Sequence, residues 1–204
     1  ILGSFSLLAL GEHKGIIFDL DGTLVDSKLD FDQLCQQLGW PLGTPILEHL
    51  ATFPLHSAEY QRALQIIHEF ELAGARSANW LPGAQELLTL LSEKQIPIAI
   101  LTRNMREATL LCIEQLAIPI EMVITREDCQ PKPDPSGLWH IAKAWQMPSH
   151  ELLFIGDYLF DLQTAHNAGM PGCLYMNEHN QHFQEMADFV LTDFAHLTEL
   201  YRKA

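Results

Sequence analysis

The sequence predicts an α/β protein: a Rossmann-like, mostly parallel sheet with helices on both faces, and a small α-helical insertion after the first strand. Two patterns support this fold class. From residue 81 onward, short and nearly continuous apolar runs alternate with amphipathic segments of helix length, which is typical of βα units. Between residues 25 and 80, the apolar residues instead recur at helical spacing, and no strand-like run is found.

The first strand is predicted at residues 16–18, which are all apolar and precede a Gly-Thr turn. The later strands are expected at residues 97–101, 120–124, 152–155, 172–175 and 189–191. Helices are expected between and after them, ending near residues 94, 117, 146, 169 and 202. Asn104 and Asp193 are the expected N-caps of the second and the last of these helices.

The insertion is expected to contain helices at residues 30–38 and 57–73, separated by a Pro- and Gly-rich stretch. At fifty to sixty residues, it is too long for an ordinary connection between a strand and a helix. We therefore predict two domains. Residues 1–24 and 81–204 form the α/β core, and residues 25–80 form a small helical domain.

Composition narrows the class of function. The 204 residues are 48% apolar and 19% charged, as in a folded globular protein, and the net charge of −14 disfavours nucleic acid and anionic membranes as partners. Four cysteines without C-x-x-C spacing favour a reducing, cytoplasmic setting. Residues 1–10 lack the basic start and cleavage site of a signal peptide, and no run is long enough to span a membrane.

Two acidic residues, Asp19 and Asp21, directly follow the first predicted strand. Side chains at positions i and i+2 of an extended segment point the same way, so the two carboxylates are expected to share one small space. Like charges so close together are unfavourable unless a cation or a shared proton intervenes. The pair is therefore interpreted as functional, with a structural role as the alternative.

Other polar residues follow the ends of the remaining predicted strands. They are Thr102, Arg103 and Asn104 after the second strand, Lys132 in the loop after the third, and Asp157 and Asp161 after the fourth. In a parallel sheet these positions meet at one edge, where ligands of such folds bind. The sequence therefore predicts one site that contains several carboxylates, a hydroxyl group and a lysine.

These residue types indicate phosphoryl transfer assisted by Mg²⁺, which prefers hard oxygen ligands. Asp19 and Asp157 are the candidate metal ligands, and a metal would keep Asp19 ionised as a nucleophile. Asp21 can act as a general acid and then as a general base. Thr102, Lys132 and the backbone N–H groups around Gly22 are candidates for holding the phosphoryl group.

The chain resembles the haloacid dehalogenase superfamily, in its phosphoglycolate phosphatase-like and β-phosphoglucomutase-like branch. Four motifs carry the resemblance in order: DLDGT at 19–23, the threonine at 102, the lysine of KPDP at 132, and GDxxxD at 156–161. The helical insertion stands where members of that branch carry a cap domain. The resemblance covers residues 15 to about 194.

The resemblance implies roles for the individual residues. Asp19 would form an aspartyl-phosphate, and Asp21 would be the acid and base while offering its backbone carbonyl to the metal. Asp157 would bind Mg²⁺, and Asp161 would orient Lys132 or a metal-bound water. The acid at position 21 favours phosphoryl transfer, because members that cleave carbon–halogen bonds lack it.

Two features depart from the family pattern. Arg103 follows Thr102, where the family often has Asn or a small residue, so an additional guanidinium is predicted to reach the substrate or the solvent. The insertion is short and has few cations, which are Lys28, Arg62 and Arg76. Arg62 and His68 are candidates for facing the substrate, with a solvated helix face as the alternative.

The expected function is that of a Mg²⁺-dependent phosphatase acting on a small phosphorylated metabolite, of the phosphoglycolate or sugar phosphate class. The predicted phosphate-binding set is Gly22, Thr102, Arg103, Asn104 and Lys132. A phosphomutase and a catalytically idle binding protein on the same fold are the alternatives. The protein is expected to be a monomer or a weak homo-oligomer.

Overall fold

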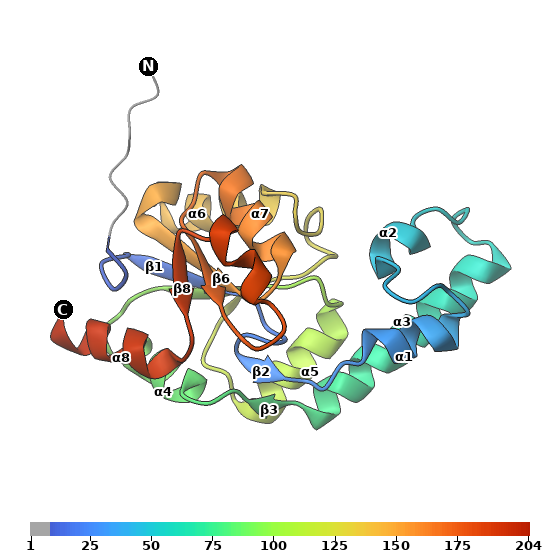
Figure 1. The fold of residues 1–204 in the computed structure, drawn as a ribbon, viewed down its shortest axis with the longest axis horizontal. Coiled ribbons are helices and arrows are strands. Elements are labelled where there is room, and N and C mark those ends of the chain that lie inside the picture. Colours follow the sequence, from blue (N-terminus) through green and yellow to red (C-terminus); the bar gives the residue numbers. More distant parts are fainter. Residues whose placement is uncertain (1–8) are drawn as a thin grey trace, which may run out of the picture.

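The central sheet has six parallel strands in the order β5-β4-β1-β6-β7-β8 (Figure 1). The computed structural model describes residues 9–204, so most of the segment considered above as a signal peptide lies outside the described residues. The strands are β1 (Gly15–Phe18), β4 (Ile98–Leu101), β5 (Met122–Ile124), β6 (Leu152–Gly156), β7 (Gly172–Tyr175) and β8 (Phe189–Leu191). The predicted fold class is confirmed.

The third predicted strand is shorter than expected. It begins at Met122, not at residue 120, because the N–H of Ile120 bonds the carbonyl of Ile118 at 2.9 Å within a tight turn. That donor is therefore not available to the neighbouring strand.

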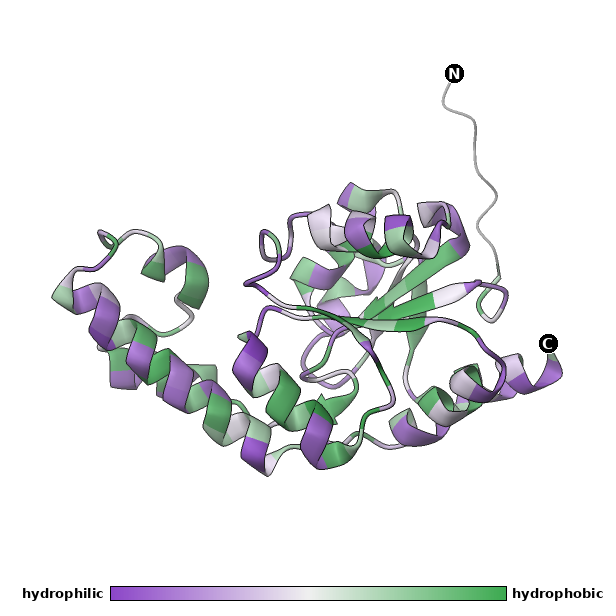
Figure 2. Ribbon diagram, turned by 180° about the vertical axis from the view of Figure 1, so that it is seen from behind, coloured by the Kyte–Doolittle hydropathy of each residue, from purple (hydrophilic) through white to green (hydrophobic). Residues whose placement is uncertain are grey.

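Five helices cover the two faces of the sheet. Successive side chains along β1 point to opposite faces and pack against the helices there. Ile16 and Phe18 pack into a cluster with helices on one face, whereas Ile17, between them, packs into the cluster on the other. Figure 2 shows the strands as hydrophobic along their length, as expected of a sheet buried on both faces. The first face carries α4 (Ala84–Glu93), α5 (Arg106–Leu116) and α8 (Phe194–Lys203), and the second carries α6 (Ser136–Trp145) and α7 (Leu159–Ala168).

The helical insertion consists of α1 (Phe31–Leu38), α2 (Ile46–Leu50) and α3 (Ala58–Ser77). In Figure 1, α1 and α3 extend away from the sheet, and α2 lies at their far end. The insertion has its own cluster of buried side chains, formed by Leu34, Leu50, Ala63 and Ile67. The helix α2 was not expected, and α3 continues four residues beyond the predicted end at 73.

The expectation that the insertion contains no strand is wrong. Its two connections to the core form a short antiparallel ladder of β2 (Val25–Asp26) and β3 (Asn79–Trp80). Two residues per strand are too few to show a period-two pattern, so only the pairing of the two connections reveals the ladder. Short 3₁₀ helices, η1 (Ser149–Glu151) and η2 (Gln181–Met186), were also not predicted.

Helix capping differs from expectation at one point that matters for the site. Asp193 caps α8 as predicted, accepting a bond from the N–H of His196. Asn104 does not cap α5, whose cap residue is Met105. The Met105 N–H is bonded at 3.0 Å by the carboxylate of Glu71, which comes from α3. This distant acid leaves the Asn104 side chain available for another contact.

Across residues 9–204, none of the helices has the length and apolar character needed to cross a bilayer.

Candidate active site

The topology brings three of the predicted residues to one edge of the sheet. Strands β4, β1 and β6 are adjacent, and Phe18 is in register with both Ile100 and Ile155. Asp19, Thr102 and Asp157 follow these three strands, so their side chains start from neighbouring positions at the carboxyl edge. The site therefore has the location that ligands take in parallel α/β sheets.

Lys132 lies at the centre of the acidic residues. Its Nζ atom is 2.6 Å from Oδ1 of Asp19 and 2.5 Å from Oδ1 of Asp161, and only 4% of its side chain is exposed. Burial alone would lower the pKa of Lys132, but Asp161 and Asp19 outweigh this effect and hold the pKa above its usual value. The charged ammonium form of Lys132 is therefore favoured.

The carboxylates of Asp19, Asp157 and Asp161 each place an oxygen within 4.8 Å of the others. Burial, followed by repulsion from neighbouring acids, raises the pKa of Asp157 to about 8. For Asp19, burial raises the pKa to about 6 despite the opposing effect of Lys132. One lysine does not balance three acids, and all the donors are hard oxygens. The set therefore fits a hard divalent cation such as Mg²⁺.

Asp21 lies in a different polar environment from Asp19. Its two carboxylate oxygens accept hydrogen bonds from Oγ of Ser27 and from Nδ2 of Asn104. Burial, and then the charge of Asp19, raise the pKa of Asp21 to about 7. Asn104 was predicted to bind phosphate, and the structure places its amide on Asp21. The two neighbouring acids thus have different partners, a cation for one and neutral donors for the other.

Gly22 shapes the turn between the acids and the first cap connection. Its φ is +77°, and a Cβ at this position would lie 2.4 Å from Oδ2 of Asp157, so a larger residue does not fit. Its N–H donates to the carbonyl of Val25 at 2.8 Å. This bond removes the Gly22 N–H from the groups predicted to hold phosphate, and the residue instead allows Asp157 to approach.

Thr102 and Arg103 lie side by side in sequence but face different neighbours. Thr102 is buried, and its Oγ1 accepts the N–H of Asn104 at 3.1 Å. The Arg103 guanidinium contacts the carboxylate of Glu48 on α2, the backbone carbonyl of Lys132 and the ring face of Phe160. The predicted additional guanidinium therefore lies between the helical insertion and the Lys132 loop.

The two candidates from the insertion do not join this group. His68 is 2.9 Å from Oε2 of Glu107 on α5, and so contacts the core helix beside the insertion. Arg62 is exposed on α3.

Three residues that support the site were missed by the sequence interpretation. Ser27 contacts Asp21, Asn180 donates from Nδ2 to the carbonyl of Asp157 at 2.7 Å, and Glu71 bonds the N–H of Met105. Each comes from a loop or helix outside the four motifs. Of the three, Ser27 was the most accessible to prediction from the sequence, because it lies six residues after Asp21 and close to the turn.

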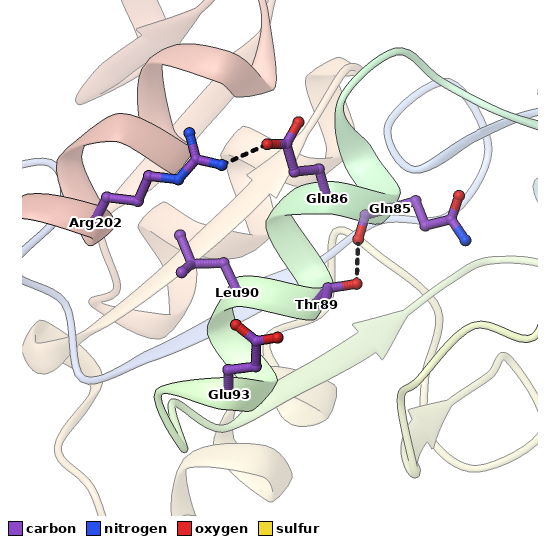
Figure 3. A pocket seen from close by; sticks show the side chains of 6 residues that line it. All are labelled: Gln85, Glu86, Thr89, Leu90, Glu93 and Arg202. Carbon is purple, nitrogen blue, oxygen red and sulfur yellow. Dashed lines mark hydrogen bonds and ion pairs between the residues drawn. The ribbon is translucent and has the colours of Figure 1, made fainter.

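A separate pocket of about 450 Å³ lies between α4 and α8 (Figure 3). Its walls are residues 85–93 of α4 and the Arg202 side chain, which reaches Oε1 of Glu86 at 2.6 Å. It is lined by Gln85, Glu86, Thr89, Leu90, Glu93 and Arg202. None of these residues belongs to the predicted site, and the ion pair is exposed.

Comparison with solved structures supports the fold. A hydrolase from Pseudomonas syringae is 23% identical, with a TM-score of 0.73 over 91% of this chain and 98% of that one. A haloacid dehalogenase-superfamily hydrolase of subfamily IA from Geobacter sulfurreducens is 18% identical, with a TM-score of 0.67 over 92% and 99%. At these identities, the likeness concerns the fold alone.

Sequence comparison identifies relatives over most of the chain. A haloacid dehalogenase-like hydrolase domain-containing protein of Arabidopsis thaliana is 30% identical over 79% of this chain and 70% of its own length. A phosphoglycolate phosphatase of Pseudomonas savastanoi is 30% identical over 92% and 78%. Residues 16–174 match the family described as haloacid dehalogenase-like hydrolase, a span that includes all four motifs. The chain therefore belongs to the haloacid dehalogenase-like hydrolase family.

Proposed function

We propose that the protein is a Mg²⁺-dependent phosphatase, which hydrolyses a phosphate monoester of a small metabolite through an aspartyl-phosphate on Asp19. The observation that supports this most directly is the separation of the two neighbouring acids. Asp19 pairs with the Lys132 ammonium at 2.6 Å, whereas Asp21 is held by the neutral groups of Ser27 and Asn104. One acid is arranged to remain a carboxylate, and the other to carry a proton.

Asp19 is the proposed nucleophile. The Lys132 ammonium favours the ionised form of Asp19 and is positioned to offset negative charge on a phosphoryl group beside it. The buried hydroxyl of Thr102 accepts the Asn104 N–H and can donate its own proton to a phosphoryl oxygen. Asp161 holds Lys132 from the other side at 2.5 Å, and so fixes where that charge lies.

Asp21 is the proposed general acid and general base. Its pKa of about 7, raised chiefly by burial, allows it to be protonated or ionised near neutral pH. It would protonate the leaving oxygen of the substrate as Asp19 attacks phosphorus. In the second half-reaction it would take a proton from the water that hydrolyses the aspartyl-phosphate. Ser27 and Asn104 keep the carboxyl group oriented through both steps.

Asp19 and Asp157, with the backbone carbonyl of Asp21, would hold Mg²⁺. The donor set fits this ion, since the carboxylate oxygens at the edge of the sheet converge and carry excess negative charge. When bound, Mg²⁺ would neutralise charge on the phosphoryl group and on Asp19. Asn180 and Gly22 serve this part of the site by fixing the position of the residue 157 loop.

The helical insertion, residues 25–80, is the proposed cap domain, with residues 1–24 and 81–204 as the catalytic core. Glu48 on α2 contacts Arg103, which also donates to the Lys132 carbonyl, so the insertion reaches a loop of the site. A cap so close to the site favours a small substrate. Relatives named phosphoglycolate phosphatase and validoxylamine A 7′-phosphate phosphatase support a phosphorylated metabolite as the substrate class. The four free cysteines suit a reducing cytoplasm, where we propose that the enzyme acts as a monomer or weak homo-oligomer.

The proposal is tested by phosphate release from p-nitrophenyl phosphate. The purified protein should release phosphate with Mg²⁺ present and lose this activity in EDTA, with recovery when Mg²⁺ is added back. Asp19→Asn should abolish turnover, because an amide is not a nucleophile for phosphorus. Asp21→Asn should slow hydrolysis of the aspartyl-phosphate, so this intermediate should accumulate. Intact-protein mass spectrometry would detect it as one added phosphoryl group.

The controls separate the alternatives. Glu86→Gln, in the exposed pair on α4, should leave release unchanged and serves as a matched acid-to-amide substitution away from the site. Undiminished activity in Asp19→Asn would refute the covalent mechanism. A phosphomutase, given a sugar with a labelled phosphate group, would transfer that phosphoryl group to another hydroxyl of the sugar instead of releasing it as phosphate. A binding protein would give no release under any of these conditions.

A further inference from the structure

Arg103 is held in a fixed position beside the residue that contacts the nucleophile. Its Nη1 donates to the backbone carbonyl of Lys132, whose own Nζ binds Asp19. Its guanidinium lies over the Phe160 ring, 4.5 Å from the ring centroid, which supports one flat face of the group. One residue, Lys132, therefore connects the Arg103 guanidinium to the proposed nucleophile.

The remaining partner of Arg103 is a carboxylate from the insertion. Both oxygens of Glu48 bind the same nitrogen, Nη2, at 2.8 and 3.0 Å. Strong arginine–carboxylate pairs instead use two nitrogens in parallel, one for each oxygen. The Glu48 side chain is also 46% exposed and comes from α2, a helix of only five residues. This contact is therefore one that a better-placed carboxylate can replace.

Other cations near the site are already committed or lie elsewhere. Lys132 is shared by Asp19 and Asp161, and Arg126 forms a largely buried pair with Glu71. The cations of the insertion are all exposed; they are Lys28, Arg62 and Arg76. A substrate with a second negative charge must also overcome the net charge of −14. Among the described residues, Arg103 is the cation best placed to bind the second negative charge of such a substrate.

We propose that Arg103 is a specificity-determining residue that binds a carboxylate of the substrate, and that Glu48 occupies this position until the substrate displaces it. The inference rests on the proposed phosphatase function and assigns its substrate class, phosphate monoesters that carry a carboxylate. The phosphoryl group lies at Asp19 and Lys132, and the carboxylate lies on the Arg103 guanidinium. Exchange of one carboxylate for another leaves the local charge of this part of the site unchanged.

The test measures binding with two analogues that are not hydrolysed. 3-Phosphonopropionate and propylphosphonate are similar in size and differ in having a carboxylate or a methyl group at the end of the chain. Titration calorimetry with Mg²⁺ gives their dissociation constants, and the ratio of the two isolates the contribution of the carboxylate. The ratio in the unmodified protein should favour 3-phosphonopropionate by roughly tenfold or more, as expected for a charged hydrogen-bonded contact.

Two substitutions should change this ratio in opposite directions. Arg103→Met removes the guanidinium and should bring the ratio close to one. Glu48→Gln removes the competing charge and should raise the ratio several-fold above that of the unmodified protein. Arg103→Lys keeps the charge without the planar fork and should give an intermediate ratio, which also serves if the methionine variant does not fold. Circular dichroism checks the fold of each variant.

The outcomes separate this inference from the phosphatase proposal. Opposite shifts in the two variants support the exchange. If both substitutions weaken both analogues equally, Arg103 and Glu48 form a structural contact and the inference is overturned. Binding of propylphosphonate with a ratio near one also overturns it, while the phosphatase proposal stands. If neither analogue binds the unmodified protein, the inference is overturned, whereas the phosphatase proposal is decided by phosphate release from p-nitrophenyl phosphate.

Discussion

Two arginine–glutamate pairs join the helical insertion to the core, and they differ in their burial and in their hydrogen-bond partners. Glu71 and Arg126, near the core end of α3, have side chains that are 10% and 13% exposed. Glu48 and Arg103, at the far end of the insertion, are 46% and 20% exposed. The first pair is largely removed from water, whereas the second is accessible to it.

The partners of each glutamate extend the difference. Glu71 bonds Arg126 through Oε1 and the N–H of Met105, at the start of α5, through Oε2. Arg126 also donates to the carbonyl of Arg103 at 3.0 Å. Glu48 has one partner, Arg103, for both of its oxygens. One pair therefore anchors α3 to the loops of the site, and the other is a single, more exposed contact, which the proposed exchange with a substrate carboxylate would open.

The largest effect is expected from Glu71→Ala. The substitution leaves the largely buried Arg126 guanidinium without its counter-charge and leaves the N–H of Met105, the cap residue of α5, without an acceptor. Removing one partner of a buried ion pair is strongly destabilising, and we expect the free energy of unfolding to fall by about 3 kcal/mol. Urea denaturation followed by circular dichroism measures this change. A loss below about 1 kcal/mol would show that water replaces Glu71 easily and would remove the contrast between the two pairs.

The helical caps show why part of this arrangement was predictable and part was not. Asp193 caps α8 by accepting a hydrogen bond from the N–H of His196, three residues later. This local pattern is visible in the sequence. The start of α5 is bonded by Glu71, 34 residues earlier in the chain. No local pattern indicates a contact of that kind. Asn104 has the residue type and position of a cap, so its contact with Asp21 required the tertiary structure.

The same distinction applies to the fold and the site. Strands of the sheet were predictable because burial on both faces makes them apolar, and the residues after them were brought together by the parallel order alone. The contact of Lys132 with Asp19 also needs the loop after β5 to reach past β4 to the end of β1. The β2–β3 ladder and the Asn180 bond to the Asp157 carbonyl depend on how segments far apart in sequence meet. Neither leaves a periodic signal.

A smaller effect is expected when both partners of the buried pair are replaced. The double variant Glu71→Leu, Arg126→Met removes both charges and retains apolar volume, so no buried charge is left unpaired. Replacements of this kind are often close to neutral. We expect a loss of about 1 kcal/mol, chiefly from the unbonded Met105 N–H. A double-mutant cycle with the two single variants measures the coupling, and simple additivity would contradict the assignment of a buried, interacting pair.

The smallest effect is expected from Glu48→Ala. Exposed ion pairs contribute little to stability, because water solvates both charges when the pair opens. The free energy of unfolding should change by less than about 1 kcal/mol, measured in the same urea titration as Glu71→Ala. Arg103 keeps its contacts with Phe160 and the Lys132 carbonyl, so its position does not depend on Glu48. A loss as large as that of Glu71→Ala would mean that the far end of the insertion is anchored as firmly as the near end, and that Glu48 is not free to give way to a substrate carboxylate.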